Sequence, residues 1–540
     1  MTYSKNYWLN EDSRTFLSRG YIEETPEERI KQIAYKAEHI LKIKGFAKKF
    51  EDYMQRGFYS LSTPVWINFG KNKGLPISCY GSNIDDSLDS ILNAGREIGL
   101  MSKYSGGTSA YLGNIRARGT KISTGGFADG PVHYTRIYDT IIDTCKQGES
   151  RRGAFAGWLP IEHDDIEDFL DIGSDGNPIQ NIQFGVTVSD EWAQSMESGD
   201  SSKRKIWAKV LQKRAEFGFP YIMYRDNANN NSPYKELGLT ITHSNLCTEI
   251  MLPNNEFESF VCCIGSINLL HWEEIVDTDA IETYTLFLNA VLDEFIFKSA
   301  SLPGMKRAHR FAKNHRAIGV GVLGYHSFLQ SKLISFESLE AKQYNYKIFK
   351  ILKEKTDSAS KELYNKKGVT SIRDGFANTT LVAIAPTKSS SFILGQVSMG
   401  IEPIKSNYFI KDLAKIKSIY KNPFLKKQLI KYNLDNKDTW ESILKKDGSV
   451  QHLDFPNKEV FKTFLEISPK EIILQAAQRQ KFIDQGQSLN LMIHPSVPTK
   501  DVNKLYLYAW KEGIKSLYYQ FSQSSAQSFV RNINECINCE

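Results

Sequence analysis

The sequence predicts an α/β protein with a mostly parallel sheet, arranged as one dominant domain. Beyond about residue 75, short apolar runs of strand length alternate with helical patterns, which is the rhythm of repeated strand–helix units. No Pro- or Ser-rich linker divides the middle of the 540-residue chain. The apolar runs are GVTVSD, VCCIGSINLL, RAIGVGVL and LVAIAP.

A helical region is expected before these runs. In residues 24–45, Thr25 can cap a helix, Pro26 suits its first position and Glu28 completes a capping box. Apolar residues follow at helical spacing, namely Ile30, Ile33, Ala37 and Ile40. We therefore expect residues 1–75 to be mainly helical.

Two later segments also have helical patterns. Residues 346–368 form one of them, which ends at Gly368, a residue type common just after a helix. The Lys-rich segment 411–432 is interpreted as another helix, with its charges on a solvated face. The net charge of +6 is mild for 540 residues, so we favour this solvated face over a nucleic-acid surface. Anionic small molecules are compatible partners.

Composition and the N-terminal sequence set further limits. Hydrophobic residues make up 41% and charged residues 24%, as in globular rather than disordered or fibrous chains. Apolar runs such as 379–386 are too short to span a membrane, and residues 1–17 have no apolar segment of signal-peptide type. We therefore expect a cytoplasmic protein without membrane contact. Seven cysteines in a chain of this length do not indicate a disulfide framework.

The run GVGVLG at 319–324 matches G-x-G-x-x-G, the pattern of dinucleotide-binding loops. That pattern needs a strand before it, a helix after it and an acidic residue that ends the next strand. The preceding FAKNHRA is a poor strand, and the next acids, Glu337 and Glu340, lie in a segment of helical character. We do not expect a nicotinamide site here.

The stretch SNLCTEI, residues 244–250, places a cysteine between an asparagine and a glutamate at a spacing of two. In an extended segment, Asn245, Cys247 and Glu249 would share one face. A thiol, a carboxylate and an amide would then meet in one small volume. The residues alone leave two interpretations open: a buried structural cysteine, or a nucleophile with His243 as a base by proximity.

Several segments, taken together and in order, resemble the catalytic subunit of class I ribonucleotide reductase. The similarity begins in WLNEDSRTFLSRGY, near residue 8, and extends to the last cysteines. The segments are LSTPVWINFG, ISCYGSNIDDSLDSI, GNIRARGT, SNLCTEIMLP, VCCIGSINL, IAPTKSSSF, GIEP, QKFIDQ and SLYYQ. Because the match begins so early, we expect the form that lacks the family's frequent N-terminal ATP-cone, and no dATP shut-off through such a domain.

The resemblance implies a ten-stranded α/β barrel made of two five-stranded parallel half-barrels. It places Cys247 on a finger loop that passes through the barrel centre. The implied domains are a helical N-terminal region (1–75), the catalytic barrel (76–521) and a flexible redox-active tail (522–540). It also implies a homodimer.

The resemblance further implies reduction of ribonucleoside diphosphates to deoxyribonucleotides, the precursors of DNA. A thiyl radical on Cys247 would remove the 3′ hydrogen of the ribose. Glu249 would take the 3′-hydroxyl proton, and burial would raise the pKa of its carboxyl towards a useful range. Asn245 would hold the substrate hydroxyls.

The other internal cysteines follow the same comparison. Cys79 and Cys262 resemble the pair that supplies two electrons by forming a disulfide. In an extended run, Cys263 points to the opposite face from Cys262, so we expect Cys263 to be structural. Cys145 is likewise expected to serve packing.

Cys536 and Cys539, near the last residue, resemble a redox arm. Sixteen residues separate Tyr519 from Cys536, which gives a coil reach of about 20–25 Å. Such an arm can reach the active site and return to a thioredoxin- or glutaredoxin-type reductant. The alternative, half of a zinc site, lacks the second pair of ligands that a closed site needs.

Tyr518 and Tyr519, in SLYYQ, resemble the relay that passes a radical from a second subunit. The sequence has no pair of Glu-x-x-His motifs for a dimetal helix bundle, so we expect no metal in this chain. The family's radical source is a ferritin-like small subunit with iron or manganese. Two alternatives stay open: an adenosylcobalamin-dependent class II reductase, and a non-catalytic nucleotide-binding paralogue.

Further residues resemble the family's substrate and effector contacts. The substrate candidates are Thr63, Ser78, Pro386, Thr387, Ser389 and Ser390. Lys388 departs from the small or acidic residue expected beside them. The candidates for an allosteric dNTP or ATP site, at the dimer interface and in its relay loop, are Asp86, Ser87, Arg116, Gln147 and Arg151. The relay loop is less rich in glycine than the family's, so we do not carry over its effector rules.

Overall fold

The computed structural model describes residues 3–104, 106–145, 153–413 and 416–522. Four helices lie in the first part of the chain: α1 (Glu11–Ser18), α2 (Pro26–Leu41), α3 (Phe46–Gln55) and α4 (Thr63–Asn68). The capping box predicted for α2 is confirmed, because Thr25 Oγ1 accepts from the Glu28 amide while Glu28 accepts from the Thr25 amide.

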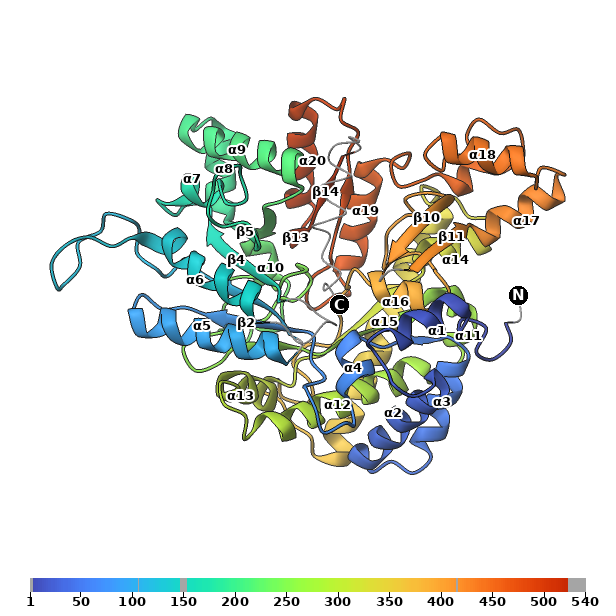
Figure 1. Cartoon of the computed structure of the whole chain (residues 1–540), viewed down its shortest axis with the longest axis horizontal. Coiled ribbons are helices and arrows are strands. Elements are labelled where there is room, and N and C mark those ends of the chain that lie inside the picture. Colours follow the sequence, from blue (N-terminus) through green and yellow to red (C-terminus); the bar gives the residue numbers. More distant parts are fainter. Residues whose placement is uncertain (1–2, 105, 146–152, 414–415, 523–540) are drawn as a thin grey trace.

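Five parallel neighbours form the first half of a barrel (Figure 1). They are β2 (Cys79–Asn83), β3 (Gly107–Tyr111), β4 (Phe155–Pro160), β5 (Gln183–Val188) and β6 (Tyr221–Tyr224). Helices connect them on the outer side, as parallel strands require. These are α5 (Leu88–Lys103), α6 (Gly130–Thr144), α7 (Ile166–Phe169), α8 (Asp190–Ser198) and α9 (Ser201–Phe217).

The second half uses shorter and less regular strands. Strand β8 (Ile264–Asn268) runs parallel to β9 (Gly319–Leu323), and bridges from Val320 to Val382 and from Ile384 to Gln487 extend the parallel set. Strand β12 (Leu491–Met492) then pairs in parallel with β14 (Gln520–Phe521). The short β1 (Tyr59–Ser60) adds an antiparallel partner to β8.

Two strands join the halves. Strand β7 (Phe260–Cys262), which continues into β8, is antiparallel to β2, and β13 (Ser516–Leu517), which continues into β14, is antiparallel to β6. Within the part of the chain that the structure describes, ten strand segments therefore close a ring of two opposed five-stranded halves. The predicted barrel is confirmed.

Helices also surround the second half. They are α11 (Trp272–Ile275), α12 (Ala280–Ser299), α13 (Lys306–His315), α14 (Tyr325–Ser331), α15 (Leu339–Lys367), α16 (Lys388–Ile393), α19 (Pro469–Gln480) and α20 (Thr499–Lys511). Helix α10 (Arg225–Asn230) instead follows β6 and contacts β5 and β6 of the first half. Helix α12 is buried on nearly every side and packs against α2, α13 and α15. Helix α15 ends where predicted, because Gly368 adopts the left-handed conformation that stops it.

The helix predicted for residues 411–432 is wrong over its first half. This segment contains most of the hairpin of β10 (Tyr408–Leu413) and β11 (Ile416–Lys421), and a helix, α17 (Pro423–Lys431), begins only at Pro423. Proline lacks an amide hydrogen and disfavours helical conformation in the residue before it, so one helix cannot run through this point. With α18 (Lys437–Lys445), these elements enclose a separate small core that includes Phe424, Trp440 and Phe461.

The GVGVLG run is itself strand β9, which explains why it is not a phosphate-binding loop. A Cβ at Gly321 would lie 2.6 Å from the carbonyl oxygen of Ala383, so glycine here allows close approach of the neighbouring strand. The FAKNHRA segment before it, interpreted as a poor strand, lies mostly in helix α13.

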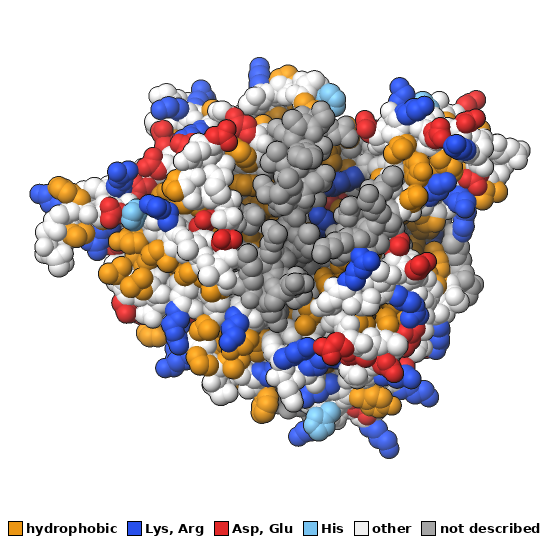
Figure 2. All heavy atoms as spheres, viewed as in Figure 1, with side chains coloured by type: hydrophobic (Ala, Val, Ile, Leu, Met, Phe, Trp, Pro, Cys, Tyr) orange, Lys and Arg blue, Asp and Glu red, His pale blue; other side chains and the backbone are white. Residues whose placement is uncertain are grey.

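Basic and acidic side chains are interspersed over the face shown in Figure 2. Among the described residues, no helix combines the length and apolar character that crossing a membrane requires.

Candidate active site

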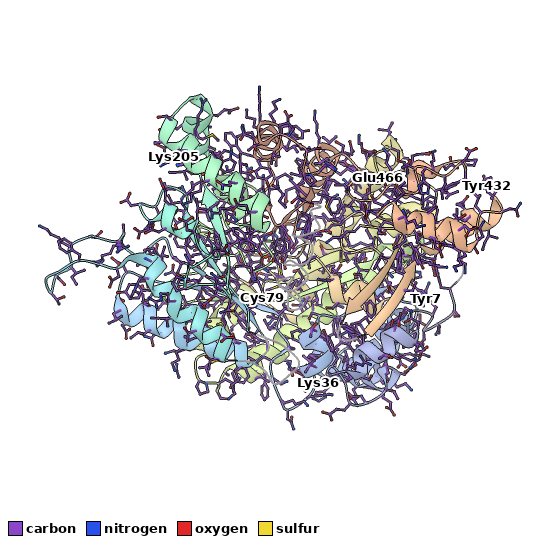
Figure 3. The ribbon with its side chains drawn as sticks, turned by 45° about the horizontal axis from the view of Figure 1, so that its top comes forward. Tyr7, Lys36, Cys79, Lys205, Tyr432 and Glu466 are labelled. Carbon is purple, nitrogen blue, oxygen red and sulfur yellow. The ribbon has the colours of Figure 1, made fainter. Side chains whose placement is uncertain are left out.

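A pocket lies where the two half-barrels meet. Cys79, on the first strand of the first half, is close to the middle of the molecule in Figure 3. The lining residues come from both halves and are Ser60, Ser62, Ser78, Cys79, Glu249, Ile264, Gly265, Ser266, Ala385, Thr387 and Ser390.

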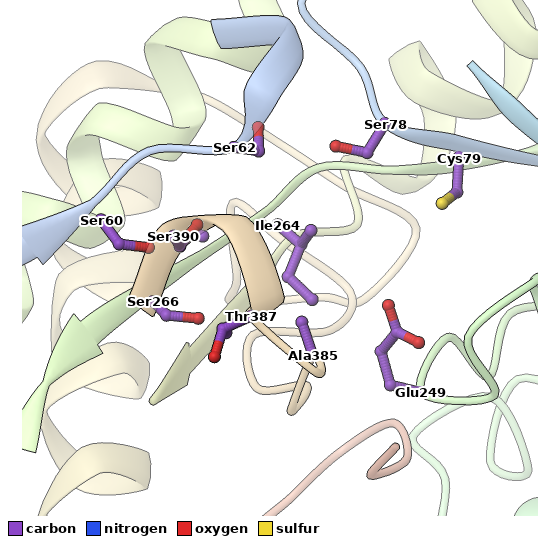
Figure 4. Close-up of a pocket in the computed structure, with 11 residues that line it drawn as sticks. Ser60, Ser62, Ser78, Cys79, Glu249, Ile264, Ser266, Ala385, Thr387 and Ser390 are labelled. Atoms are coloured by element: carbon purple, nitrogen blue, oxygen red, sulfur yellow. The ribbon is translucent and has the colours of Figure 1, made fainter. Parts of the chain in front are cut away.

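The pocket has two chemically different sides (Figure 4). Hydroxyl groups from Ser60, Ser266, Thr387 and Ser390 gather on one side. On the other side, Glu249 extends towards the wall that carries Cys79. The pocket can therefore offer hydrogen-bond partners at one side and a carboxylate with a thiol at the other.

Glu249 belongs to the central loop, residues 240–253, which contains no helix or strand. The loop turns at Cys247: Thr248 has a left-handed φ of 66°, and its amide lies 3.4 Å from the Asn245 carbonyl oxygen. The expected extended alternation of Asn245, Cys247 and Glu249 is therefore wrong. A turn in the loop, rather than a strand face, gathers these residues.

All three side chains are nonetheless buried together in the barrel. Cys247 and Asn245 are 0% exposed and Glu249 is 2% exposed. Burial raises the pKa of the Glu249 carboxyl to about 7, while hydrogen bonds to its own backbone, to Asn245 and to Ser488 partly oppose this shift. A carboxyl with this pKa can accept and release a proton near neutral pH. Cys247 does not itself line the pocket.

Cys79 and Cys262 lie directly opposite each other on the antiparallel strands β2 and β7. Burial raises the pKa of the Cys262 thiol well above its usual value, and interactions with Cys79 and Glu249 raise it further. The Cys262 thiol is therefore neutral, and it lies beside Cys79 and close to the carboxyl group. Cys263 faces the other way, and its Sγ donates to the Leu288 carbonyl on α12 at 3.4 Å.

Of the six substrate candidates from Thr63 to Ser390, three line this pocket and three do not. Ser78, Thr387 and Ser390 line the pocket. Pro386 and Ser389 adjoin them in sequence but do not line it. Thr63 contacts Tyr21 through its hydroxyl at 3.3 Å, and its neighbour Ser62 lines the pocket instead.

Sequence reasoning missed Ser60, Ser62 and Ser266. Ser60 and Ser266 are opposite each other in the β1–β8 pairing, which brings together residues about 200 positions apart. No local sequence pattern predicts that strand pairing. Ser62 had a local signal, since it stands in the LSTP segment beside Thr63.

Tyr518 and Tyr519 follow β13, and their ring centroids are 4.4 Å apart. A third ring, Tyr221 on β6, lies 4.8 Å from Tyr518 and 5.1 Å from Tyr519. The Tyr518 amide donates to the Leu489 carbonyl at 2.9 Å, so the backbone of the pair is held by the barrel. Nothing in the sequence distinguishes Tyr221 from an ordinary strand tyrosine.

His243 does not support a role as base for a cysteine. Its imidazole is buried between Phe260 and Tyr111, and burial lowers its pKa to about 3. The ring therefore stays neutral, and its Nδ1 faces Thr242 and Asn254.

Three effector candidates, Asp86, Ser87 and Arg116, lie in the segments that follow strands β2 and β3 of the first half-barrel. Arg116 Nε donates to Asp86 Oδ2 at 2.6 Å, and Ser87 caps the start of α5. Gln147 and Arg151 lie outside the described residues, as do Cys536 and Cys539. Across the described ranges, no group of three His, Cys, Asp or Glu side chains could hold a metal ion.

Comparison with known proteins points to one family. The family model described as "Ribonucleotide reductase, barrel domain" matches residues 77–203, 194–373 and 370–520. The ribonucleoside-diphosphate reductase large subunit of Invertebrate iridescent virus 3 is 30% identical, over 96% of this chain and 95% of its own length. The large chain from Schizosaccharomyces pombe is 27% identical, over 96% of this chain and 74% of its own.

A solved structure is similar over nearly the whole chain. The Actinobacillus ureae class Id ribonucleotide reductase alpha subunit aligns with a TM-score of 0.92 and 52% identity, covering 99% of this chain and 100% of that one.

Proposed function

The chain belongs to the ribonucleotide reductase family as a ribonucleoside-diphosphate reductase large subunit, and from this premise we propose how its residues perform the reduction. The observation that carries the proposal is the meeting of Glu249 and Cys79 at one pocket, with Cys262 directly opposite Cys79 on the adjacent strand. A base and a two-electron thiol pair are what replacement of a 2′-hydroxyl by hydrogen requires.

The proposed reaction begins with a thiyl radical on Cys247, which takes the 3′ hydrogen of the ribose. Glu249 accepts the 3′-hydroxyl proton, and its raised pKa suits that transfer. One thiol of the Cys79–Cys262 pair protonates the 2′-hydroxyl, which leaves as water. The other thiol supplies the hydrogen that the 2′ carbon gains, and the pair becomes a disulfide. Glu249 then returns its proton to the 3′ oxygen, and Cys247 returns the 3′ hydrogen and becomes a thiyl radical again. The balance is one ribonucleotide and two thiols to one deoxyribonucleotide, one water and one disulfide.

The two sides of the pocket support this orientation of the substrate. Asn245 and Glu249 would hold the ribose edge near the cysteines. The hydroxyl groups of Thr387 and Ser390, with Ser60 and Ser266 beside them, would take the diphosphate or adjacent ribose oxygens. Thr63 is the weakest substrate candidate, because its hydroxyl contacts Tyr21.

The radical would arrive through Tyr519 and Tyr518 from a ferritin-like small subunit with a dimetal site. Contact between the two rings supports transfer between them. After each turnover, Cys536 and Cys539 would reduce the internal disulfide and receive electrons from a thioredoxin- or glutaredoxin-type protein. We place this activity in the cytoplasm.

Choice of substrate would be controlled by a dNTP or ATP bound at Asp86, Ser87 and Arg116, with Gln147 and Arg151 in the relay. We propose a homodimer, with this site at its interface. Helix α5 starts at the same residues and exposes Leu88 and Leu92 by 59% and 52%. Leucines this exposed on adjacent turns suit a contact with a second copy.

The test is deoxycytidine product formed from CDP and from CTP with dithiothreitol, with either the small subunit from the same genome or adenosylcobalamin added. Turnover should require the small subunit and be lost in Tyr518→Phe. Tyr325→Phe is the matched control, because Tyr325 is also a buried tyrosine with a bonded hydroxyl but lies behind the second half-barrel. Turnover with cobalamin alone would assign the chain to class II chemistry. Absence of product with either addition would favour a non-catalytic paralogue.

A further inference from the structure

Residues 485–488 lie between α19 and β12. They form hydrogen bonds with every second residue of the central loop from Cys247 to Met251. The Met251 amide donates to Gln485 Oε1 at 3.2 Å, and the Gly486 amide donates to the Glu249 carbonyl oxygen at 2.7 Å. Ser488 Oγ donates to the Cys247 carbonyl oxygen at 2.6 Å. We name residues 485–488 the clamp segment. It holds the loop at the turn that carries Cys247 and along the residues that follow the turn.

Gly486 allows the clamp segment to approach this closely. A Cβ at this position would lie 3.1 Å from the carbonyl oxygens of Thr248 and Glu249, and 3.0 Å from the Met251 side chain. These atoms leave little room for any larger residue. The close packing of clamp and loop is therefore a property of this glycine.

Ser488 differs from the rest of the clamp because it also touches a reacting group. Its Oγ lies 3.1 Å from Glu249 Oε2 as well as 2.6 Å from the Cys247 carbonyl oxygen. A serine hydroxyl has one proton but can also accept, so it must divide its proton between these two oxygens. Ser488 is 2% exposed, so water cannot easily replace either contact.

We propose that Ser488 is a positioning residue that links the carboxylate of Glu249 to the backbone of Cys247. The inference rests on the proposed function, in which Glu249 is the base and Cys247 carries the radical. When Glu249 is ionised, Ser488 donates to it and to the Cys247 carbonyl. When Glu249 has taken a proton, its own O–H can donate to Ser488 Oγ, and the serine proton goes wholly to the Cys247 carbonyl. In both protonation states, Ser488 therefore keeps the Glu249 carboxyl group in a fixed position relative to the Cys247 backbone.

The groups around Glu249 allow its pKa to serve as a measure of the hydrogen bond from Ser488. The titratable side chains beside it are Cys79 on β2, which lines the same pocket, and Cys262 on β7, which interacts with Glu249; Cys247 lies two residues away on the same loop. Nearby Lys515, on the chain before β13, instead donates to the carbonyl oxygens of Asn231 and Asp484.

The first experiment follows the Glu249 carboxyl by infrared spectroscopy during a pH titration, with Glu249→Gln identifying its band. In Ser488→Ala the pKa of Glu249 should rise above that of the wild-type protein, because a hydrogen bond that favours the ionised form is lost. Ser488→Thr keeps the hydroxyl and should restore the wild-type pKa. This measurement does not depend on turnover, so it tests the inference even if the proposed function fails.

Ser516→Ala is the matched control. Ser516 is an equally buried serine whose Oγ donates to the Thr248 carbonyl at 2.7 Å, so it holds the same loop without touching the carboxylate. Its removal should leave the pKa of Glu249 in place. An unchanged pKa in Ser488→Ala, or an equal shift in Ser516→Ala, would overturn the proposal.

Kinetics provide the second readout. Ser488→Ala should lower kcat by about 10- to 100-fold with a smaller change in KM, the range expected for loss of a buried hydrogen bond to a charged group. The acid limb of its pH–rate profile should move to higher pH, and Ser488→Thr should reverse both effects. A loss of kcat without movement of that limb would show a structural role only.

Discussion

The central loop and the proposed effector region, which contains Asp86, Ser87 and Arg116, differ in how completely this chain builds them. In the loop, Asn245, Cys247 and Glu249 are buried, and the clamp segment donates hydrogen bonds to the backbone carbonyls of Cys247 and Glu249. In the effector region, Asp86 and Arg116 form an ion pair whose side chains are 35% and 38% exposed. The first site is organised within one chain, whereas the second presents charges at a surface.

This difference has an energetic meaning. Burial shifts the pKa of Glu249 to about 7, so the loop stores unfavourable energy whenever that carboxyl is ionised. The exposed Asp86–Arg116 pair contributes little to stability, because water screens it. We therefore expect substitutions in the loop to affect chemistry and stability strongly, and substitutions in the effector region to affect mainly regulation.

The largest effect is expected for Cys247→Ser. A serine hydroxyl does not form the radical that the proposed reaction needs, so turnover should fall by about 10⁴-fold or more. The measurement is deoxynucleotide product per enzyme with saturating small subunit. Cys145→Ser, a half-buried cysteine away from the pocket, should keep most of the activity. Comparable turnover in Cys247→Ser would remove the radical role from this residue.

Glu249→Gln should reduce kcat by about 10²- to 10⁴-fold, the usual contribution of a positioned base. It should also reveal the energetic cost of the loop. The folded-state pKa of Glu249 lies above its ordinary value of 4.5, so the wild-type protein loses stability as pH rises from there to about 7. Glutamine does not ionise.

The variant should therefore be more stable than the wild-type protein above pH 7, by an amount of up to about 3 kcal/mol, and the difference should disappear below the ordinary pKa. Urea unfolding at both pH values measures this. If the variant is less stable at high pH, the burial cost assigned to Glu249 is wrong.

The wild-type pH–rate profile should show an acid limb at about pH 7, where Glu249 gains its proton. Activity should rise through this limb as pH increases, because the ionised form is the base. In Glu249→Gln the limb should be absent from the residual activity. A limb that persists unchanged would assign the titration to another group.

At the effector region, Leu92→Asp should weaken the proposed dimer by at least about tenfold in Kd, because it places a charge in an apolar contact. Sedimentation at several protein concentrations measures the change. Leu444→Asp is the control, since Leu444 is a leucine of similar exposure on α18, in the separate lobe. Equal dissociation in both variants would exclude α5 as the interface.

The smallest effect on stability is expected for Arg116→Ala. Loss of an exposed pair should change the free energy of unfolding by about 0.5 kcal/mol or less. Basal turnover should persist while its response to added dNTP disappears. A retained response would place the effector elsewhere.

Local chemistry in the sequence determined several features without help from tertiary structure. The α2 capping box and the end of α15 at Gly368 depend on residues within a few positions of each other, and both were predicted. The strand–helix rhythm indicated the fold class, and motif resemblance gave the ten-stranded barrel and the family. The order of the family motifs can be read from the sequence, although the contacts between those motifs cannot.

Tertiary structure decided the geometry of the site. The turn at Cys247 replaced the extended alternation predicted for its neighbours, because contacts from the clamp segment, far along the chain, hold the loop in that shape. Pairing of β1 with β8 brought Ser60 to the pocket, and Tyr221 came to the tyrosine pair through β6. Such pairings depend on the free energy of the whole closed barrel, so no local pattern encodes them. The sequence thus predicted which groups react, and the barrel decided how those groups face one another.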